Sequence, residues 1–184
     1  AIECFMPLSY GGGITDFETA RAIMSTGFEK LVINTQAFHN RSLITQLSRH
    51  FGNQAIIASI DVKKNIWNKY VVYVRDGSEK IDTDVVEYAK EMEKAGAGEI
   101  LLTSMDRDGT WAGFDTEITK RISEAVTVPV IANGGAGNTA HIEEVVKKGG
   151  ASAVSLGSMV VYQQKGMGVL VNFPDKRQLE KILE

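Results

Sequence analysis

The stretch Pro129-Val-Ile-Ala-Asn-Gly-Gly135 joins a short apolar run to a pair of glycines, and Pro7-Leu-Ser-Tyr-Gly-Gly-Gly13 has the same form 122 residues earlier. A second pair of motifs repeats this spacing, because Asn34-Thr35 and Gly157-Ser158 each follow another apolar run and lie 123 residues apart. Four strand–helix units of a (β/α)₈ barrel take about 124 residues. The repeat therefore predicts two related half-barrels.

Short apolar runs alternate with amphipathic segments along the whole chain, which predicts parallel strand–helix units. The apolar runs are Met6–Tyr10, Leu31–Ile33, Ala55–Ile60, Ile100–Thr103, Val128–Ala132 and Ala153–Leu156. The expected helices are Phe17–Thr26, Ser42–His50, Thr83–Ala95, Thr116–Ala125 and Thr139–Lys148, with N-caps expected at Thr15-Asp16, Ser42, Asp82-Thr83 and Asp115-Thr116.

Six units at about 31 residues each would take about 186 residues, and the chain has 184. We therefore expect residues 1–184 to form one incomplete domain of a phosphate-binding α/β (β/α)₈ barrel, with strands 3 to 8 present and the first two units absent.

Composition excludes several classes of protein. The formal net charge of -3 gives no basic footprint for nucleic acid, and the single Cys excludes an internal disulfide and favours a reducing, cytoplasmic location. No apolar run has the roughly 18 residues of a membrane span, and the start of the chain lacks the pattern of a signal peptide. His39, His50 and His141 lack metal-ligand spacing. We therefore expect no nucleic-acid or membrane partner, no metal and no cofactor.

The repeated motifs predict two phosphate sites. Glycines directly after a strand let backbone N–H groups turn toward an anion at the start of the following helix, and Asn, Thr and Ser side chains add hydrogen bonds. We define the first cradle as Gly12, Gly13, Asn34 and Thr35, and the second cradle as Gly134, Gly135, Gly157 and Ser158. A lone pair of glycines is more often only a tight turn, but two matched pairs favour binding. Two cradles across a barrel mouth imply a long substrate with a phosphate at each end.

Carboxylates follow two of the apolar runs. Asp61 comes directly after Ala55–Ile60, where barrel enzymes carry their chemistry, although a solvated role or neutralisation by Lys63 or Lys64 is the alternative. The segment Asp106-Arg107-Asp108-Gly109 follows the next run. Three charged side chains in a row cannot all point into one site, so at least one of them is expected to be structural. Carboxylates at a barrel mouth suit general acid/base chemistry when burial tunes their pKa.

The segment Lys63–Lys80 interrupts the strand–helix rhythm. Its alternating apolar residues, from Trp67 to Val74, precede the turn signal Asp76-Gly77. This pattern predicts an inserted β-hairpin. The hairpin is either a lid or rim over the substrate or a solvated excursion, and the sequence favours neither.

Longer motifs resemble those of the HisF family, the cyclase subunit of imidazole glycerol phosphate synthase. They are Tyr10-Gly-Gly-Gly-Ile14, Asp16-Phe-Glu-Thr-Ala20, Val32-Ile-Asn-Thr35, Ile60-Asp61, Gly98-Glu-Ile-Leu-Leu-Thr-Ser-Met-Asp-Arg-Asp-Gly-Thr110 and Ile131-Ala-Asn-Gly-Gly-Ala-Gly137. The resemblance runs from about Met6 to Ser158. It implies a cyclase/lyase of histidine biosynthesis that uses ammonia from a HisH-like glutaminase partner docked on the opposite face of the barrel. The implied substrate carries two phosphates and yields imidazole glycerol phosphate and AICAR.

The resemblance also implies roles for single residues. Asp61 matches one of two catalytic aspartates, a general acid/base, and Asp108 lines the site. One phosphate would contact Gly13, Asn34 and Thr35, and the other Gly109, Gly135, Gly157 and Ser158. Lys30 and Glu99 match members of a charged ring where ammonia enters, and Glu29 matches an acidic residue that faces the glutaminase.

Some features depart from that family pattern. The second catalytic aspartate would fall before Ala1, Asn133 replaces a usual Ser, and the tail Met159–Pro174 differs. The tail and the insertion at Trp67–Val74 resemble a HisF-like branch associated with amidation of a nucleotide-linked acetamido sugar for lipopolysaccharide. Sugar amidation and a non-catalytic phosphate-binding barrel are therefore the alternatives to imidazole formation. Six strands without closure would also leave two sheet edges. We therefore expect either self-association through these edges or a longer gene product that contains the missing first units.

Overall fold

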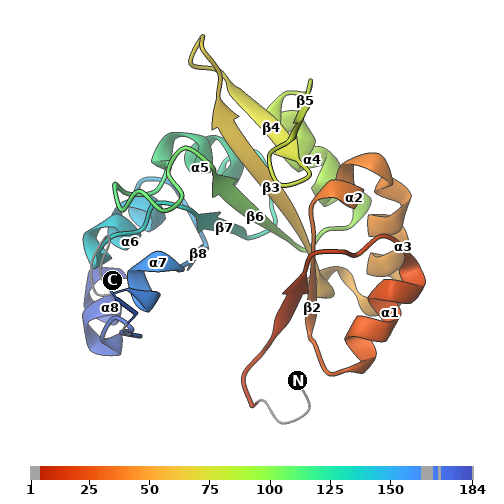
Figure 1. Cartoon of the computed structure of the whole chain (residues 1–184), viewed down its shortest axis with the longest axis horizontal. Helices are drawn as coiled ribbons and strands as arrows, with labels where there is room; N and C mark the ends of the chain where they lie inside the picture. Colours follow the sequence, from red (N-terminus) through yellow and green to blue (C-terminus); the bar gives the residue numbers. More distant parts are fainter. Residues whose placement is uncertain (1–4, 163–167, 170, 184) are drawn as a thin grey trace.

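The parallel strands form one curved sheet in the computed structural model, which describes residues 5–162, 168, 169 and 171–183 (Figure 1). The strands are β1 (Ser9–Gly11), β2 (Lys30–Ile33), β3 (Ile56–Lys64), β6 (Glu99–Ser104), β7 (Val130–Asn133) and β8 (Ala153–Ser155). They pair in the order β1-β2-β3-β6-β7-β8, and every neighbouring pair on this path is parallel. The sheet curls into a half-barrel, as expected for part of a (β/α)₈ barrel.

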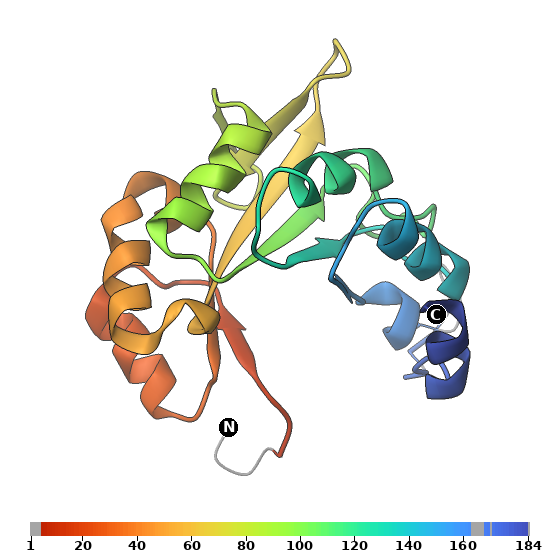
Figure 2. The same ribbon diagram turned by 180° about the vertical axis from the view of Figure 1, so that it is seen from behind.

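The helices are α1 (Phe17–Ser25), α2 (Thr35–His39), α3 (Arg41–Phe51), α4 (Val85–Ala95), α5 (Thr116–Ser123), α6 (Thr139–Lys147), α7 (Ser158–Val161) and α8 (Lys176–Leu183), with a 3₁₀ turn at Asn53–Ala55. The longer helices α1, α3, α4, α5 and α6 cover the outer, convex face of the sheet (Figure 1). Seen from behind, α8 lies beside α6, with which it packs (Figure 2). Each parallel strand leads to at least one helix, so the expected count of six strand–helix units is confirmed.

Burial alternates along the strands and separates the two faces of the sheet. In β6, Ile100 and Leu102 are buried, whereas Leu101 and Thr103 are only half-buried. The same alternation occurs in β2 and β7. Since successive side chains point to opposite faces, the helices bury the convex face and the concave face stays partly open. Most concave positions are only half-buried, because the six strands described do not close around an interior.

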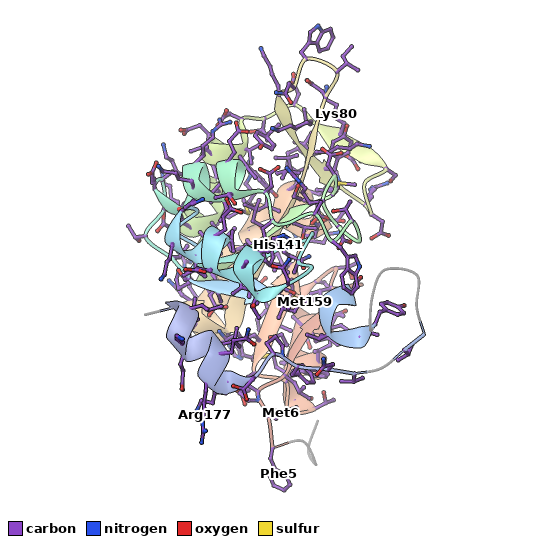
Figure 3. The ribbon with its side chains drawn as sticks, turned by 90° about the vertical axis from the view of Figure 1, so that its left-hand side faces the viewer. Phe5, Met6, Lys80, His141, Met159 and Arg177 are labelled. Atoms are coloured by element: carbon purple, nitrogen blue, oxygen red, sulfur yellow. The ribbon has the colours of Figure 1, made fainter. Side chains whose placement is uncertain are left out.

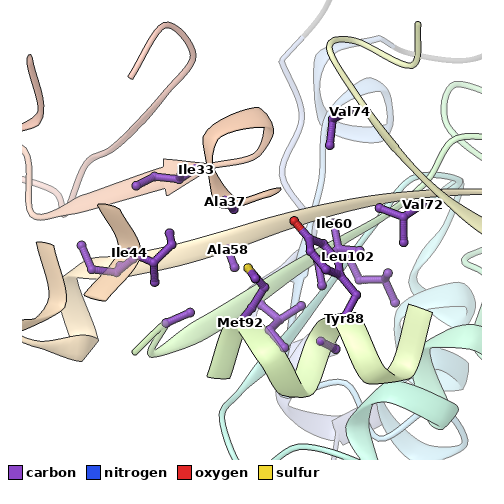
Figure 4. Close-up of a cluster of buried hydrophobic side chains, with 14 of the residues drawn as sticks. Ile33, Ala37, Ile44, Ala58, Ile60, Val72, Val74, Tyr88, Met92 and Leu102 are labelled. Carbon is purple, nitrogen blue, oxygen red and sulfur yellow. The ribbon is translucent and has the colours of Figure 1, made fainter. Parts of the chain in front are cut away.

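The main core lies between the sheet and the helices. Tyr88 and Met92 on α4 pack against Ile60 and Leu102 of the central strands (Figure 4), and all four are almost fully buried. Asp84 begins α4 by accepting hydrogen bonds from the backbone N–H groups of the first turn. Burying a large apolar side chain contributes about 1.5 to 3 kcal/mol, so this packing holds the central strands in place beneath the concave face.

The expected hairpin is confirmed as β4 (Tyr70–Val74) and β5 (Glu79–Ile81). It pairs antiparallel with the end of β3, where Asp61 lies opposite Tyr73. For this reason β3 continues past Asp61 to Lys64 instead of ending at the aspartate. The hydroxyl of Tyr70 donates hydrogen bonds to Asp115 and Glu117 at the start of α5. These bonds fix the base of the hairpin to the body of the sheet.

Several boundaries differ from the expected ones. β1 begins at Ser9, later than the expected Met6. Asp16 and Asp115 cap α1 and α5 as expected, but α3 starts after Asn40 instead of Ser42 and α4 starts after Asp84 instead of Asp82-Thr83. The short helix α2 was not expected. Its five residues are too few for a periodic apolar pattern.

The amino ends and the carboxyl ends of the parallel strands lie toward opposite ends of the molecule. Lys80 of the hairpin and Phe5 before β1 lie at opposite ends of the molecule (Figure 3). The carboxyl ends of the parallel strands therefore open toward the hairpin. Among the residues described, no helix is long and apolar enough to cross a membrane. The single Cys4 and the tail residues 163–167 and 170 lie outside the described part of the chain.

Candidate functional site

A row of polar side chains crosses the carboxyl end of the concave face. Asp61 of β3 is level with Thr103 of β6, Thr103 with Asn133 of β7, and Asn133 with Ser155 of β8. All four are half-buried. The Asn133 side-chain amide donates to the Thr103 hydroxyl at 3.1 Å. We call these four residues the polar row, and a cavity lies at each end of it.

The first cavity, of about 450 Å³, lies where β1, β2 and β3 end. Its lining residues are Gly11, Gly12, Gly13, Ile14, Thr15, Val32, Ile33, Asn34, Thr35, Gln36, Ser59, Asp61, Arg75 and Asp76. All four residues of the first cradle thus face one space, although 21 positions separate Gly13 from Asn34 in the chain. Asp61 borders the same space, so the structure brings the cradle and the expected acid/base together.

Asp61 is held by neighbours on both sides. The side-chain amide of Asn34 donates to its carboxylate at 3.2 Å and to the Ser59 carbonyl at 3.2 Å. Burial raises the pKa of the Asp61 carboxyl above its usual value, and the nearby charge of Asp76 adds to the rise. Hydrogen bonds, that of Thr103 above all, oppose it. A carboxyl with a raised pKa is better suited to exchange protons near neutral pH than an exposed one.

In the part of the chain that the structure describes, neither Lys63 nor Lys64 forms an ion pair with Asp61. Lys64 pairs with Glu117 at 3.0 Å, and Lys63 is exposed. Neutralisation by Lys64 is therefore wrong, because β3 carries that side chain toward α5.

The second cavity, of about 280 Å³, lies where β7 and β8 end. Its lining residues are Asp108, Gly109, Asn133, Gly134, Gly135, Ala136, Ser155, Gly157 and Ser158. The four residues of the second cradle, together with Gly109, therefore share one space. Asp108 borders this cavity and not the first one.

Backbone conformation repeats between the two cradles. Gly12 and Gly13 have φ of 101° and 68°, and the matching Gly134 and Gly135 have 92° and 102°. Asn34 and Gly157, each before a short helix, have nearly equal angles, φ/ψ of -109°/-84° and -110°/-92°. The 122-residue repeat in the sequence is thus a repeat of loop shape as well.

The charged cluster after β6 is divided between structure and site. Asp106 accepts a hydrogen bond from the Lys64 backbone N–H at 2.7 Å, so it ties the loop to β3. Arg107 is exposed, and Asp108 turns to the second cavity. The expectation that at least one of the three is structural is confirmed by Asp106.

A second charged group lies at the opposite end of the strands. Lys30 and Glu99 are the first residues of β2 and β6, and their side chains form a half-buried ion pair across β3. Glu29, just before β2, is exposed at the same edge. These three residues therefore lie at the amino end of the sheet, away from Asp61.

Among the residues of the first cavity that sequence reasoning missed, Arg75 and Asp76 in the hairpin turn are the charged ones. The Asp76-Gly77 pair signalled a turn but not where that turn would lie. The Arg75 backbone N–H donates to the Thr35 hydroxyl at 3.1 Å, which joins positions 40 residues apart. The hairpin is thus a rim of the first cavity, not a solvated excursion.

A family model described as histidine biosynthesis protein matches residues 1–166. The chain belongs to this family. The matched range contains all six parallel strands and both cradles.

The chain is also similar to individual proteins that are named as HisF subunits. The chain is 48% identical, over 162 residues, to imidazole glycerol phosphate synthase subunit HisF of Alkaliphilus metalliredigens, covering 88% of the chain and 64% of that protein. It is 42% identical to the putative imidazole glycerol phosphate synthase subunit hisF2 of Pseudomonas aeruginosa, over 97% of the chain and 71% of that relative. The HisF subunit of a Nostoc species is also 42% identical, over 97% of the chain and 70% of that relative. The chain thus spans about two thirds of the length of these relatives.

Proposed function

We propose that this chain carries the two phosphate sites and one acid/base of an imidazole glycerol phosphate synthase cyclase. The substrate would be the two-phosphate imidazole precursor, which ammonia converts to imidazole glycerol phosphate and AICAR. The relatives named as HisF subunits support this proposal. A phosphate in each cradle would hold the substrate along the polar row, with its reacting part beside Asp61.

The observation that carries the proposal is the half-buried carboxyl of Asp61 between two similar loop structures. Glycine loops that turn backbone N–H groups toward a ligand suit phosphate. Asn34 and Thr35 in the first cradle, and Ser158 in the second, would add donors, and Gly109 would border the second phosphate. Fixing both ends of a substrate places its centre without further contacts, which is an effective source of rate enhancement. Asp61 would exchange protons there as general acid/base, and Asp108 would line the far end.

Ammonia would enter from the amino end of the sheet in this proposal. Lys30 and Glu99 form a paired charged group there, at the foot of the concave face. Glu29 is exposed beside them and would face a HisH-like glutaminase subunit. Charge reversal at Glu29 is expected to weaken glutaminase binding while leaving turnover with ammonium salt unchanged.

Two measurements on the natural gene product test the proposal. The first is turnover of the two-phosphate precursor with ammonium salt, and the second is binding of that precursor. Asp61→Asn should lower turnover by about 10² to 10⁴ fold, the usual contribution of a general acid/base, and leave precursor affinity nearly unchanged. Asp82→Asn is the matched control, because Asp82 is exposed and borders neither cavity.

Each other outcome points to a different function. Binding of the precursor without any turnover, in wild type and Asp61→Asn alike, would indicate a non-catalytic phosphate-binding barrel. Turnover of a nucleotide-linked acetamido sugar, and none of the imidazole precursor, would indicate sugar amidation.

Self-association through the sheet edges is a further part of the proposal. In the described part of the chain, β1 and β8 each have one strand neighbour only, and all three residues of β1 are exposed. Unpaired strand edges are templates for pairing with another chain. Light scattering of this chain should show species larger than a monomer, and a stable monomer at high concentration would contradict the idea.

A further inference from the structure

The first cavity contains an unexplained imbalance of charge. Two carboxylates border it, those of Asp61 and Asp76, and among the described residues that line it Arg75 is the one cation. A phosphate dianion in the first cradle would therefore add negative charge beside negative charge. A cation within a few ångströms of the phosphate would offset this repulsion.

The backbone at Arg75 is held in a demanding conformation beside the cradle. Arg75 and Asp76 have φ of 52° and 54°, a left-handed region that non-glycine residues seldom adopt. The hydrogen bond from the Arg75 N–H to the Thr35 hydroxyl fixes this turn against the cradle. Positive φ is usual in tight Asp-Gly hairpin turns, so the bond to Thr35, and not the backbone angle, is what holds this turn against the cradle.

The guanidinium of Arg75 is oriented by one ion pair, which occupies only part of its N–H donors. Its Nε contacts Glu79 at 3.0 Å, and Glu79 also contacts His39 of α2 at 3.2 Å. A guanidinium has five N–H donors, so an ion pair through Nε leaves the two terminal amino groups able to bind another anion. Those amino groups form the planar fork that binds phosphate in a bidentate way. At 64% exposure, the Arg75 side chain is open to a ligand.

We propose that Arg75 is a substrate-binding residue whose terminal amino groups contact the phosphate held in the first cradle. Glu79 acts as the positioning residue that holds the Nε edge. This inference rests on the proposed phosphate site and deepens it, because it makes the two ends of the substrate site unequal. The first end has an arginine, whereas the described residues that line the second cavity include no Lys or Arg.

Titration of the ¹⁵N-labelled chain with inorganic phosphate, followed by NMR, tests the inference. The amide signals of Gly12 and Gly13 report on the first cradle, and those of Gly134 and Gly135 report on the second. Arg75→Gln should weaken phosphate binding at the first cradle by about tenfold or more, as for loss of a hydrogen bond to a charged group. Binding at the second cradle should not change. Arg75→Lys, which keeps the charge but loses the fork, should give an intermediate loss.

Arg21→Gln is the matched control. Arg21 is 62% exposed, pairs with Glu18 and borders neither cavity, so its loss should change neither cradle. Equal phosphate affinity at Gly12 and Gly13 in wild type and Arg75→Gln would overturn the role of Arg75 and leave the phosphate site intact. Absence of phosphate-dependent shifts at both cradles of the wild-type chain would instead overturn the proposed function, and this inference with it.

Discussion

The two cradles have the same loop shape but different surroundings. A Cβ atom added at Gly13 would meet nothing within 4 Å, whereas one at the matching Gly135 would lie 2.2 Å from the Gly113 carbonyl oxygen. Gly12 and Gly13 are exposed, and Gly134 and Gly135 are buried. The first loop therefore needs glycine for its backbone angles alone, and the second needs it for its angles and for close packing.

This difference shows how one loop shape can be supported in two ways. The second cradle is held from beneath by the loop after β6, where the Gly113 N–H donates to the Gly135 carbonyl at 2.8 Å. The first cradle is open below and is instead bordered by the hairpin turn at Arg75. The second cradle is thus packed against a neighbouring loop, and the first is bordered by the hairpin turn.

Alanine at the matched glycines should give the largest contrast. Gly135→Ala should lower the free energy of unfolding by about 3 kcal/mol or more, because backbone strain and a clash with a carbonyl oxygen add together. Gly13→Ala should cost about 1 to 2 kcal/mol, since only its left-handed conformation is disfavoured. Urea unfolding followed by circular dichroism measures both. Equal losses would show that the second loop can move away from the added methyl group.

Removing one hydroxyl from each cradle should give a smaller contrast. Ser158→Ala should weaken phosphate binding at the second cradle by about tenfold, for the loss of one hydrogen bond to a charged group. Thr35→Ala should weaken the first cradle by more, about thirtyfold, because Thr35 also accepts the Arg75 N–H that fixes the hairpin turn. The ¹⁵N titration with inorganic phosphate measures both. Thr35→Ser keeps the hydroxyl and should restore most of the affinity, and a larger loss for Ser158→Ala would reverse the comparison.

The two carboxyls expected in the site, those of Asp61 and Asp108, should differ in their effect on stability. The pKa of Asp61 is raised by burial, so the folded state binds its proton more tightly than the unfolded state does. The contribution of Asp61 to stability is then present below the ordinary carboxyl pKa and lost as pH rises through the raised one. Asp61→Asn should therefore stabilise the chain at pH 7, by an amount that disappears at acid pH.

Asp108→Asn is the comparison for that measurement. Asp108 is exposed at the rim of the second cavity, so its replacement should change stability little at either pH. Urea unfolding at pH 7 and at pH 3 tests both variants. A loss of stability in Asp61→Asn at pH 7 would mean that the carboxylate is better satisfied in the folded chain than its burial suggests.

Local pattern was enough to predict much of the fold. The apolar run Ile100–Thr103 falls within β6, and the capped segment after Asp115 is α5, because burial period and capping chemistry are both local in sequence. The cradle glycines were also predictable, since their position directly after apolar runs and their fixed repeat spacing can be read from the sequence. The N-cap of α4 was missed because Asp82, Thr83 and Asp84 are all good caps and only packing chooses among them.

Contacts between distant segments could not be predicted. Nothing near Arg75 signals that its turn will reach Thr35, and nothing near Asp61 signals the bond from Asn34 or the pairing with β4. These contacts depend on the curvature of the sheet and on where the hairpin folds back. The sequence predicted which residues could form the site, and the fold determined that two hairpin residues join them.

A structure of the chain with the two-phosphate imidazole precursor bound would test the central claim most directly. We predict one phosphate against Gly12, Gly13, Asn34 and Thr35 and the other against Gly134, Gly135, Gly157 and Ser158. The middle of the ligand should lie within hydrogen-bond reach of the Asp61 carboxyl. A precursor bound with only one phosphate in a cradle, or bound away from the concave face, would contradict the account.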